Sequence, residues 1–138
     1  MVTRLVTASL VFAIAIADAA PVIEVRATCA AELASEPAHL RTLRGELAQA
    51  LARTTATASY TLDVSLVRLG VATVGRELEV RAEVRAMLSD AHGKIRWSST
   101  SRSAARGPAA DRIRLQRDAV SAAARDLARS VRAHCCTR

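Results

Sequence analysis

Aromatic side chains make up only 2% of this 138-residue chain, and they are Phe12, Tyr60 and Trp97. A hydrophobic core must therefore be built from Leu, Val, Ile and Ala, and such a core is thin. The shortage also argues against recognition of nucleic acid, because aromatic stacking platforms are missing and no helix-turn-helix pattern takes their place. We therefore expect no nucleic-acid partner.

Sequence motifs of catalysis and of metal binding are also missing. The chain has no H-E-x-x-H, no G-x-S-x-G, no Walker loop and no G-x-G-x-x-G. Its three histidines do not share a metal-ligand spacing; they are His39, His92 and His134. The run His134-Cys135-Cys136 together with Cys29 offers zinc ligands, but structural zinc sites usually show paired C-x-x-C or H-x-x-x-H elements. We expect no enzymatic activity, no metal and no cofactor.

No apolar run is long enough to span a membrane. Leu5–Ala17 is interrupted only by two hydroxyl residues, and a spanning helix needs about 20 apolar residues. Arg4 precedes this run, and Ala17-Asp18-Ala19 fits the small-x-small rule for signal-peptidase cleavage. The pattern predicts a signal peptide over residues 1–19 and a single domain over residues 20–138, periplasmic or secreted, with no transmembrane span after cleavage. The alternative is an N-terminal anchor that stays in the membrane.

Basic residues outnumber acidic ones, 20 to 13, and the formal net charge is +7. Such an excess favours anionic partners. The alternative is that the arginines reflect composition alone, because most of them are spaced along the chain and interleaved with acids. The candidate anion-binding residues are Arg81, Arg85, Lys94, Arg96, Arg125, Arg129 and Arg132.

The clearest strand pattern begins at Leu78. Apolar residues occupy every second position from there to Leu88, which predicts one buried and one charged face. Ser89–Gly93 supplies turn residues and so predicts a β-hairpin.

The return strand of this hairpin should repeat the alternation. We expect Ile95 and Trp97 to point inward. The residues expected to point outward are Lys94, Arg96 and Thr100. Residues 98–106 are rich in Ser and Arg, and they are expected to become a loop that ends at Gly107-Pro108.

Two earlier segments also alternate. Val22–Thr28 alternates apolar and polar residues, and Cys29 continues its apolar side; Tyr60–Leu66 alternates in the same way. Val71–Val74 lies between two glycines and is either a bent strand end or a turn.

Two segments have helical periodicity. Ser35-Glu36-Pro37 is typical of a helix start, and the leucines that follow on one stripe are Leu40, Leu43, Leu47 and Leu51. Asp111–His134 is the clearest helix, with an apolar stripe of Ile113, Val120, Ala124, Leu127 and Val131. The order β-α-β-β-β-α predicts an α+β, two-layer fold: a mostly antiparallel sheet of about four strands with two helices packed on one face.

The cysteines suggest a disulfide from Cys29 to Cys135. Both continue an inward-facing pattern, one on the first strand and the other on the last helix, and an exported protein meets an oxidising compartment. Cys136 would be left over, because it is turned about 100° away on the helix. The alternative is three reduced thiols, since connectivity cannot be deduced from sequence.

The turn and return strand, Asp90-Ala91-His92-Gly93-Lys94-Ile95-Arg96-Trp97-Ser98, resemble the D-x-x-G-x-x-x-W-s hairpin of a family of bacterial envelope accessory proteins. These are curli-secretion, polysaccharide-export, lipopolysaccharide-assembly and peptidoglycan-synthase-activating lipoproteins. The resemblance covers residues 60–133, the small α/β domain, and includes the alanine-rich last helix. Unlike those relatives, this chain has no lipobox, because Cys29 follows Arg26-Ala27-Thr28.

The resemblance implies an exported, non-enzymatic binding or assembly-accessory module of the cell envelope, with another envelope protein as its partner. The alternative is an Arg-rich domain that binds an anionic envelope polymer or surface.

Overall fold

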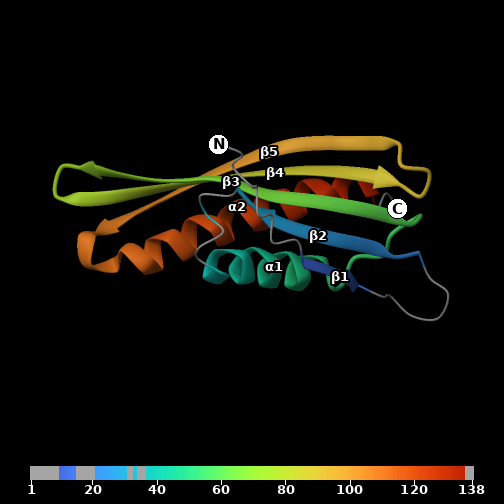
Figure 1. Ribbon diagram of the computed structural model, residues 1–138, viewed down its shortest axis with the longest axis horizontal. Coiled ribbons are helices and arrows are strands. Elements are labelled where there is room, and N and C mark those ends of the chain that lie inside the picture. Colours follow the sequence, from blue (N-terminus) through green and yellow to red (C-terminus); the bar gives the residue numbers. More distant parts are fainter. Residues whose placement is uncertain (1–9, 15–20, 31–32, 34–36, 136–138) are drawn as a thin grey trace, which may run out of the picture.

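The computed structural model has one sheet with both helices on the same face (Figure 1). The strands are β1 (Leu10–Ile14), β2 (Ile23–Cys29), β3 (Tyr60–Val74), β4 (Glu77–Asp90) and β5 (Ile95–Pro108). The helices are α1 (Pro37–Leu51) and α2 (Arg112–Cys135), the latter preceded by a 3-10 turn, η2 (Ala109–Asp111). Strand order in the sheet follows chain order, β1-β2-β3-β4-β5.

The structure describes residues 10–14, 21–30, 33 and 37–135. Three sequence features discussed above lie outside these residues: the predicted cleavage site at Ala17–Ala19, the predicted helix cap Ser35, and Cys136. Within the described residues, no helix combines the length and the apolar composition that a membrane crossing requires.

Strand direction follows from the lengths of the connections. β2 and β3 are parallel and are joined through α1, because a parallel pair needs a long crossover. The pairs β1–β2, β3–β4 and β4–β5 are antiparallel. From β2 onward, the predicted order β-α-β-β-β-α and the predicted α+β, two-layer class are confirmed, and β1 adds a fifth strand before it.

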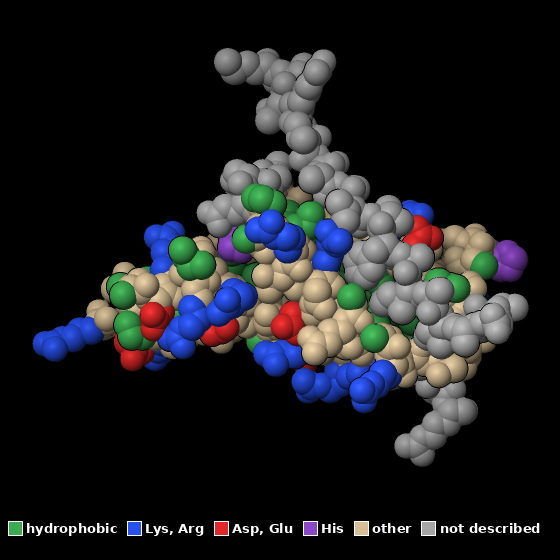
Figure 2. Space-filling model, turned by 90° about the horizontal axis from the view of Figure 1, so that it is seen from below, with side chains coloured by type: hydrophobic (Ala, Val, Ile, Leu, Met, Phe, Trp, Pro, Cys, Tyr) green, Lys and Arg blue, Asp and Glu red, His purple; other side chains and the backbone are tan. Residues whose placement is uncertain are grey.

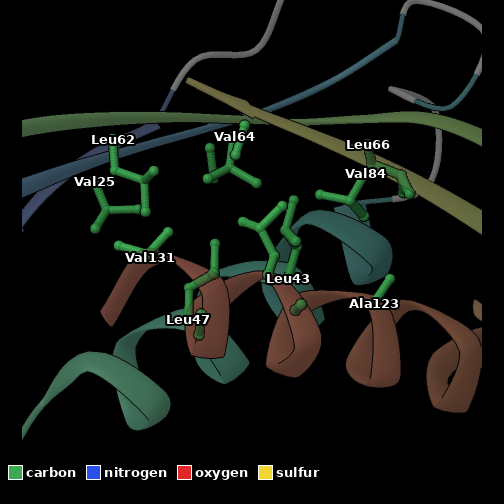
Figure 3. Close-up of a cluster of buried hydrophobic side chains, with 14 of the residues drawn as sticks. Val25, Leu43, Leu47, Leu62, Val64, Leu66, Val84, Ala123 and Val131 are labelled. Atoms are coloured by element: carbon green, nitrogen blue, oxygen red, sulfur yellow. The ribbon is translucent and has the colours of Figure 1, made fainter. Parts of the chain in front are cut away.

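The core lies between the sheet and the helices (Figure 3). The predicted alternation is confirmed in β2, β3 and β4, whose inward residues are almost all buried. The leucine stripe of α1 is confirmed as well, with Leu43, Leu47 and Leu51 buried and Leu40 half-buried. Figure 3 shows Val25 and Leu62 of the sheet pointing toward the helices. The sheet and helix stripes thus bury each other, as a two-layer fold requires.

Val71–Val74 belongs to a strand. β3 continues to Val74, and the chain turns at Gly75, whose φ of +64° is a conformation that glycine adopts without strain. The β3–β4 pairing register shifts by one residue between Leu66 and Arg68, because Leu66 pairs with Val84 and Arg68 with Glu83, and pairing continues on both sides of this bulge. The β3–β4 hairpin therefore extends well beyond the end of β2, as Figure 1 shows.

The prediction for Ile95 was wrong, and that for Trp97 holds only in part. Trp97 pairs with Leu88, whereas Ile95 pairs with Ser89, so Arg96 is an extra residue in β5. This bulge changes the face to which the strand presents its side chains. Ile95 is consequently 56% exposed, while Trp97 is half-buried against the core.

The predicted loop over residues 98–106 is also wrong, because β5 continues to Pro108. Its core-facing residues are small: Ser101 is buried and its hydroxyl donates a hydrogen bond to Asp126 of α2, 2.9 Å away. At Gly107, a Cβ would lie 3.1 Å from the Leu115 side chain. Small residues thus allow α2 to lie close beneath the strand, which a hydrophobic pattern cannot reveal.

The apolar stripe predicted for α2 is confirmed for Val120, Leu127 and Val131, but Ile113 is 83% exposed. Leu115 takes the buried position in the first turns of the helix. The two side chains lie about 200° apart around the helix, so only one of them can face the core, and the orientation of the helix against β5 decides between them.

The predicted Cys29–Cys135 disulfide is absent, because Cys29 is a buried free thiol. Cys29 ends β2, while the Cys135 carbonyl accepts hydrogen bonds from the backbone N–H and the Oγ1 of Thr57, 3.3 and 2.9 Å away. Thr57 lies just before Tyr60, which pairs with Ile23 at the other end of β2. A strand of this length spans about 20 Å, whereas a disulfide requires Cα atoms within about 7 Å. Both cysteines face the core, but at opposite ends of it.

Candidate binding face

The face of the sheet opposite the helices is the candidate functional site. α1 and α2 pack against each other and against the other face of the sheet. Outward residues of β2 to β5 therefore form cross-strand rows that are not covered by either helix. Since every strand alternates, the register alone determines which side chains meet in a row.

Two neighbouring rows form an open hollow of about 580 Å³. The first row runs Arg26, Asp63, Met87, Ser98, and the second runs Thr28, Ser65, Arg85, Thr100. The Thr28 hydroxyl donates to Ser65 Oγ at 3.1 Å. The hollow thus combines hydroxyl groups, a carboxylate and two guanidinium groups around the half-exposed thioether of Met87, a combination suited to binding polar ligands or a polar protein surface.

A second hollow, of about 530 Å³, lies over the neighbouring cross-strand rows, and its lining residues form several ion pairs. Glu83 lies between Arg68 on β3 and Arg102 on β5. Its carboxylate is 3.2 Å from Arg102 Nε and 3.5 Å from Arg85 Nη2. These contacts, the hydrogen bond from Arg102 above all, lower the pKa of Glu83.

Glu79 has the same arrangement four residues earlier on β4. Its carboxylate accepts a hydrogen bond from Arg106 Nη2 at 2.7 Å and another from Arg81 Nε. The bond from Arg106 is the largest cause of the lowered pKa of Glu79, followed by the bond from Arg81. Two carboxylates are thus surrounded by more guanidinium groups than they can neutralise, so this part of the face carries excess positive charge.

The structure distributes the predicted anion-binding residues over three places. Arg81 and Arg85 lie on the candidate binding face. Lys94 and Arg96 lie at the β4–β5 turn, where Asp90 accepts hydrogen bonds from the backbone N–H groups of His92 and Lys94 and from Arg96 Nε. These bonds, that from Lys94 first, lower the pKa of Asp90.

The remaining predicted residues belong to α2, on the other side of the molecule: Arg125, Arg129 and Arg132. Arg132 Nη1 donates to the Ala50 carbonyl at 2.9 Å, and Arg125 Nε lies 3.9 Å from Glu46. These two contacts join α2 to α1. Figure 2 likewise shows Lys and Arg side chains in several separate groups, with acidic side chains among them.

Sequence reasoning missed three arginines of the face: Arg68, Arg102 and Arg106. Arg102 and Arg106 lie in the segment that the sequence predicts as a loop, although they share the even-numbered positions of Arg96 and Thr100. That period of two was the available signal, and serines at the core-facing positions obscured it.

No family model matches this chain, and no curated protein does. Solved structures do. A putative lipoprotein from Caulobacter crescentus is 24% identical with a TM-score of 0.48, over 69% of this chain and 78% of that one. A minor lipoprotein from Acinetobacter baumannii is 18% identical with a TM-score of 0.54, over 67% of this chain and 82% of that one.

A protein from Xanthomonas campestris assigned to the family model DUF330 is 17% identical with a TM-score of 0.50, over 67% of this chain and 58% of that one. At these identities the likeness concerns the fold. The fold of this chain is thus similar to that of the Acinetobacter lipoprotein and of the Xanthomonas protein.

Proposed function

We propose that this chain is an exported, non-enzymatic accessory module of a bacterial cell envelope, and that it binds another envelope protein through the uncovered face of its sheet. The observation that carries the proposal is the pair of adjacent hollows on that face. The fold likeness to the Acinetobacter lipoprotein and the predicted signal peptide support an envelope location.

The chemistry of the two hollows supports binding. Their lining contains hydroxyl, guanidinium and carboxylate groups together with Met87, and it includes neither histidine nor cysteine. Both glutamates there are held by arginines and have lowered pKa values. A carboxylate that stays ionised in this way is a poor proton donor near neutral pH.

Site-specific photo-cross-linking in the native host would test this proposal. A photoreactive amino acid replaces Thr100 on the binding face, and a matched control replaces Arg129 on the outer side of α2; both positions are exposed. We expect a discrete cross-linked envelope protein from position 100 and none from position 129. Cross-links of equal yield at both positions, or at neither, would contradict binding through this face.

A second candidate function is binding of an anionic envelope polymer. The observation in its favour is the excess of arginine around Glu79 and Glu83. Exposed guanidinium groups attract polyanions, and the attraction weakens with salt.

Dextran sulfate provides a defined probe for this second function. The double variant Arg102→Gln and Arg106→Gln should weaken binding several-fold at low salt. The control, Arg125→Gln with Arg129→Gln, removes the same charge from the helix side. Equal weakening by both pairs would show net charge alone to be responsible and would exclude a site on the sheet.

A further inference from the structure

The backbone of β2 forms hydrogen bonds on two sides. On one side, the Val22 carbonyl accepts from the N–H of Tyr60 at 3.0 Å, and the Ala30 N–H donates to the Leu66 carbonyl at 2.9 Å. The backbone N–H and C=O groups of the even-numbered residues of β2 therefore point toward β3. Successive residues of a strand point their backbone groups to opposite sides. The backbone groups of the odd-numbered residues therefore point away from β3. These residues are Ile23, Val25, Ala27 and Cys29.

β1 occupies that second side. It runs antiparallel to β2, with Leu10 opposite Ala27, Phe12 opposite Val25 and Ile14 opposite Ile23. β1 is a five-residue segment, Leu-Val-Phe-Ala-Ile, without charge, proline or glycine. It lies within the predicted signal peptide, so cleavage after Ala19 would remove the strand and leave the odd-numbered backbone groups of β2 unpaired.

The two edges of the sheet differ in how they are protected. Edge strands usually avoid unwanted pairing through charged residues, proline or bulges. β5 has all three, namely several arginines, Pro108 and the bulge at Arg96. β2 is regular and has no proline, and its two charged residues, Glu24 and Arg26, pair with each other at 3.2 Å. The residues whose backbone groups point to this edge, Ile23, Val25 and Ala27, have apolar side chains buried in the core. Once β1 is gone, β2 is an edge ready for pairing.

We propose that, in the exported chain, the β2 edge is a strand-accepting site, and that its occupant is an extended, uncharged apolar segment of a partner envelope protein. The segment aligns antiparallel to β2, as β1 does, and its backbone supplies the affinity, which is the mode called β-strand addition. The proposal rests on the predicted export and extends the proposed function to a second contact, at the edge of the sheet.

Amide hydrogen exchange measured residue by residue by NMR tests this inference. The protein is the chain purified from the periplasm, with its N-terminus determined. The probe is a synthetic peptide of residues 9–15 with two added lysines for solubility. Without the peptide, the amides of Val25 and Ala27 should exchange at least ten times faster than those of Arg26 and Thr28, which face β3.

Adding the peptide should slow exchange at Val25 and Ala27 at least tenfold and leave Arg26 and Thr28 unchanged. A peptide with Phe12→Pro, which lacks one of the N–H groups facing β2, is the matched control and should protect much less. In the uncleaved full chain, Val25 and Ala27 should be protected without any peptide.

Three results would overturn the proposal. If the exported chain retained residues 10–14, β1 would still pair with β2 and would leave no edge for a partner segment. If the amides of odd-numbered residues of β2 exchanged as slowly as those of even-numbered residues in the cleaved chain, the edge of β2 would already be paired. Equal protection by both peptides would show non-specific adsorption. The variant Arg102→Gln should not alter peptide protection, so failure at this edge is distinguishable from failure at the sheet face.

Discussion

The indole ring of Trp97 lies beside the imidazole of His134, with ring centroids 5.4 Å apart and ring planes 34° from parallel. Trp97 lies on the edge strand β5, and His134 lies in the last turn of α2. The pair therefore joins the start of β5 to the end of the chain's final helix, at the place where the bulge in β5 turns Ile95 outward.

Trp97 is the single tryptophan, so its fluorescence reports on this contact. We expect an emission maximum between those of buried and fully hydrated indole, and a red shift in His134→Ala. Trp97→Ala should lower the free energy of unfolding by about 1–3 kcal/mol, less than the loss for a fully buried aromatic. An emission maximum unaffected by His134→Ala would contradict the contact.

The orientation of α2 is tested by two nearby apolar residues. Leu115→Ala should cost about 2–5 kcal/mol, because Leu115 is 3% exposed and packs beneath β5. Ile113→Ala should change stability by less than about 0.5 kcal/mol, because Ile113 is 83% exposed. Urea titrations of both variants measure the difference. The reverse order would mean that the helix is rotated about its axis.

Acid stability should depend on Glu79. Its pKa in the folded chain lies below the ordinary value, owing first to Arg106 and then to Arg81. The stabilisation is therefore complete above the ordinary glutamate pKa and is lost as the pH falls through the lowered one. Glu79→Gln should flatten the decrease in urea midpoint on that acid side, whereas Glu77→Gln, exposed on the same strand, should leave it unchanged. Equal flattening by the two variants would refute a special role for Glu79.

Cys29 should behave as a protected free thiol. Burial raises the pKa of its thiol, and the thiolate is the form that reacts. Alkylation without reductant should thus be slow in the folded protein and rapid in urea, where peptide mapping should recover Cys29 modified. Cys29→Ala should cost about 1 kcal/mol, the typical effect of one substitution. Recovery of Cys29 in a disulfide-linked peptide would restore the bridge predicted from the sequence.

Export should remove the N-terminal segment. The pattern of Arg4, an apolar run and Ala17-Asp18-Ala19 predicts a mature protein that begins near Ala20. N-terminal sequencing of protein from the native host measures this directly. Ala19→Arg should block cleavage and cause the precursor to accumulate, while Thr3→Ser should have no effect. A soluble cytoplasmic protein that begins at Met1 or Val2 would exclude export.

Much of the fold could be predicted because apolar alternation and helical periodicity are local signals. They identified the inward residues of β2 and β4 and the leucine stripe of α1. Where the core-facing residues are small or polar, as at Ser101 of β5, the alternation disappears and the sequence predicts a loop in place of the strand. Both errors of side-chain direction, at Ile95 and Ile113, arise at a bulge or at a helix end, where packing overrides periodicity.

The candidate binding face could be predicted only in part, because a site on a sheet depends on register. Arg81 and Arg85 are found from the alternation of one strand. Their neighbours Arg68 and Arg102 come from other strands and meet only through the pairing on both sides of Glu83. The disulfide prediction failed for a related reason: periodicity shows which face a cysteine points to, but not how far along the layer it lies.

The parallel pairing of β2 with β3 has a consequence for the order of assembly. β3, β4 and β5 are joined by tight turns, so their contacts close short loops and can form early. Ile23 pairs with Tyr60, and the whole of α1 lies between them in the chain. This contact can therefore form only after the segment that contains α1 and β3 is available. In the predicted export, β2 would leave the translocation channel before β3 and could complete its pairing only after β3 had followed. During that interval an unpaired apolar strand would be accessible to chaperones and proteases, and the length of the interval would affect the yield of folded protein.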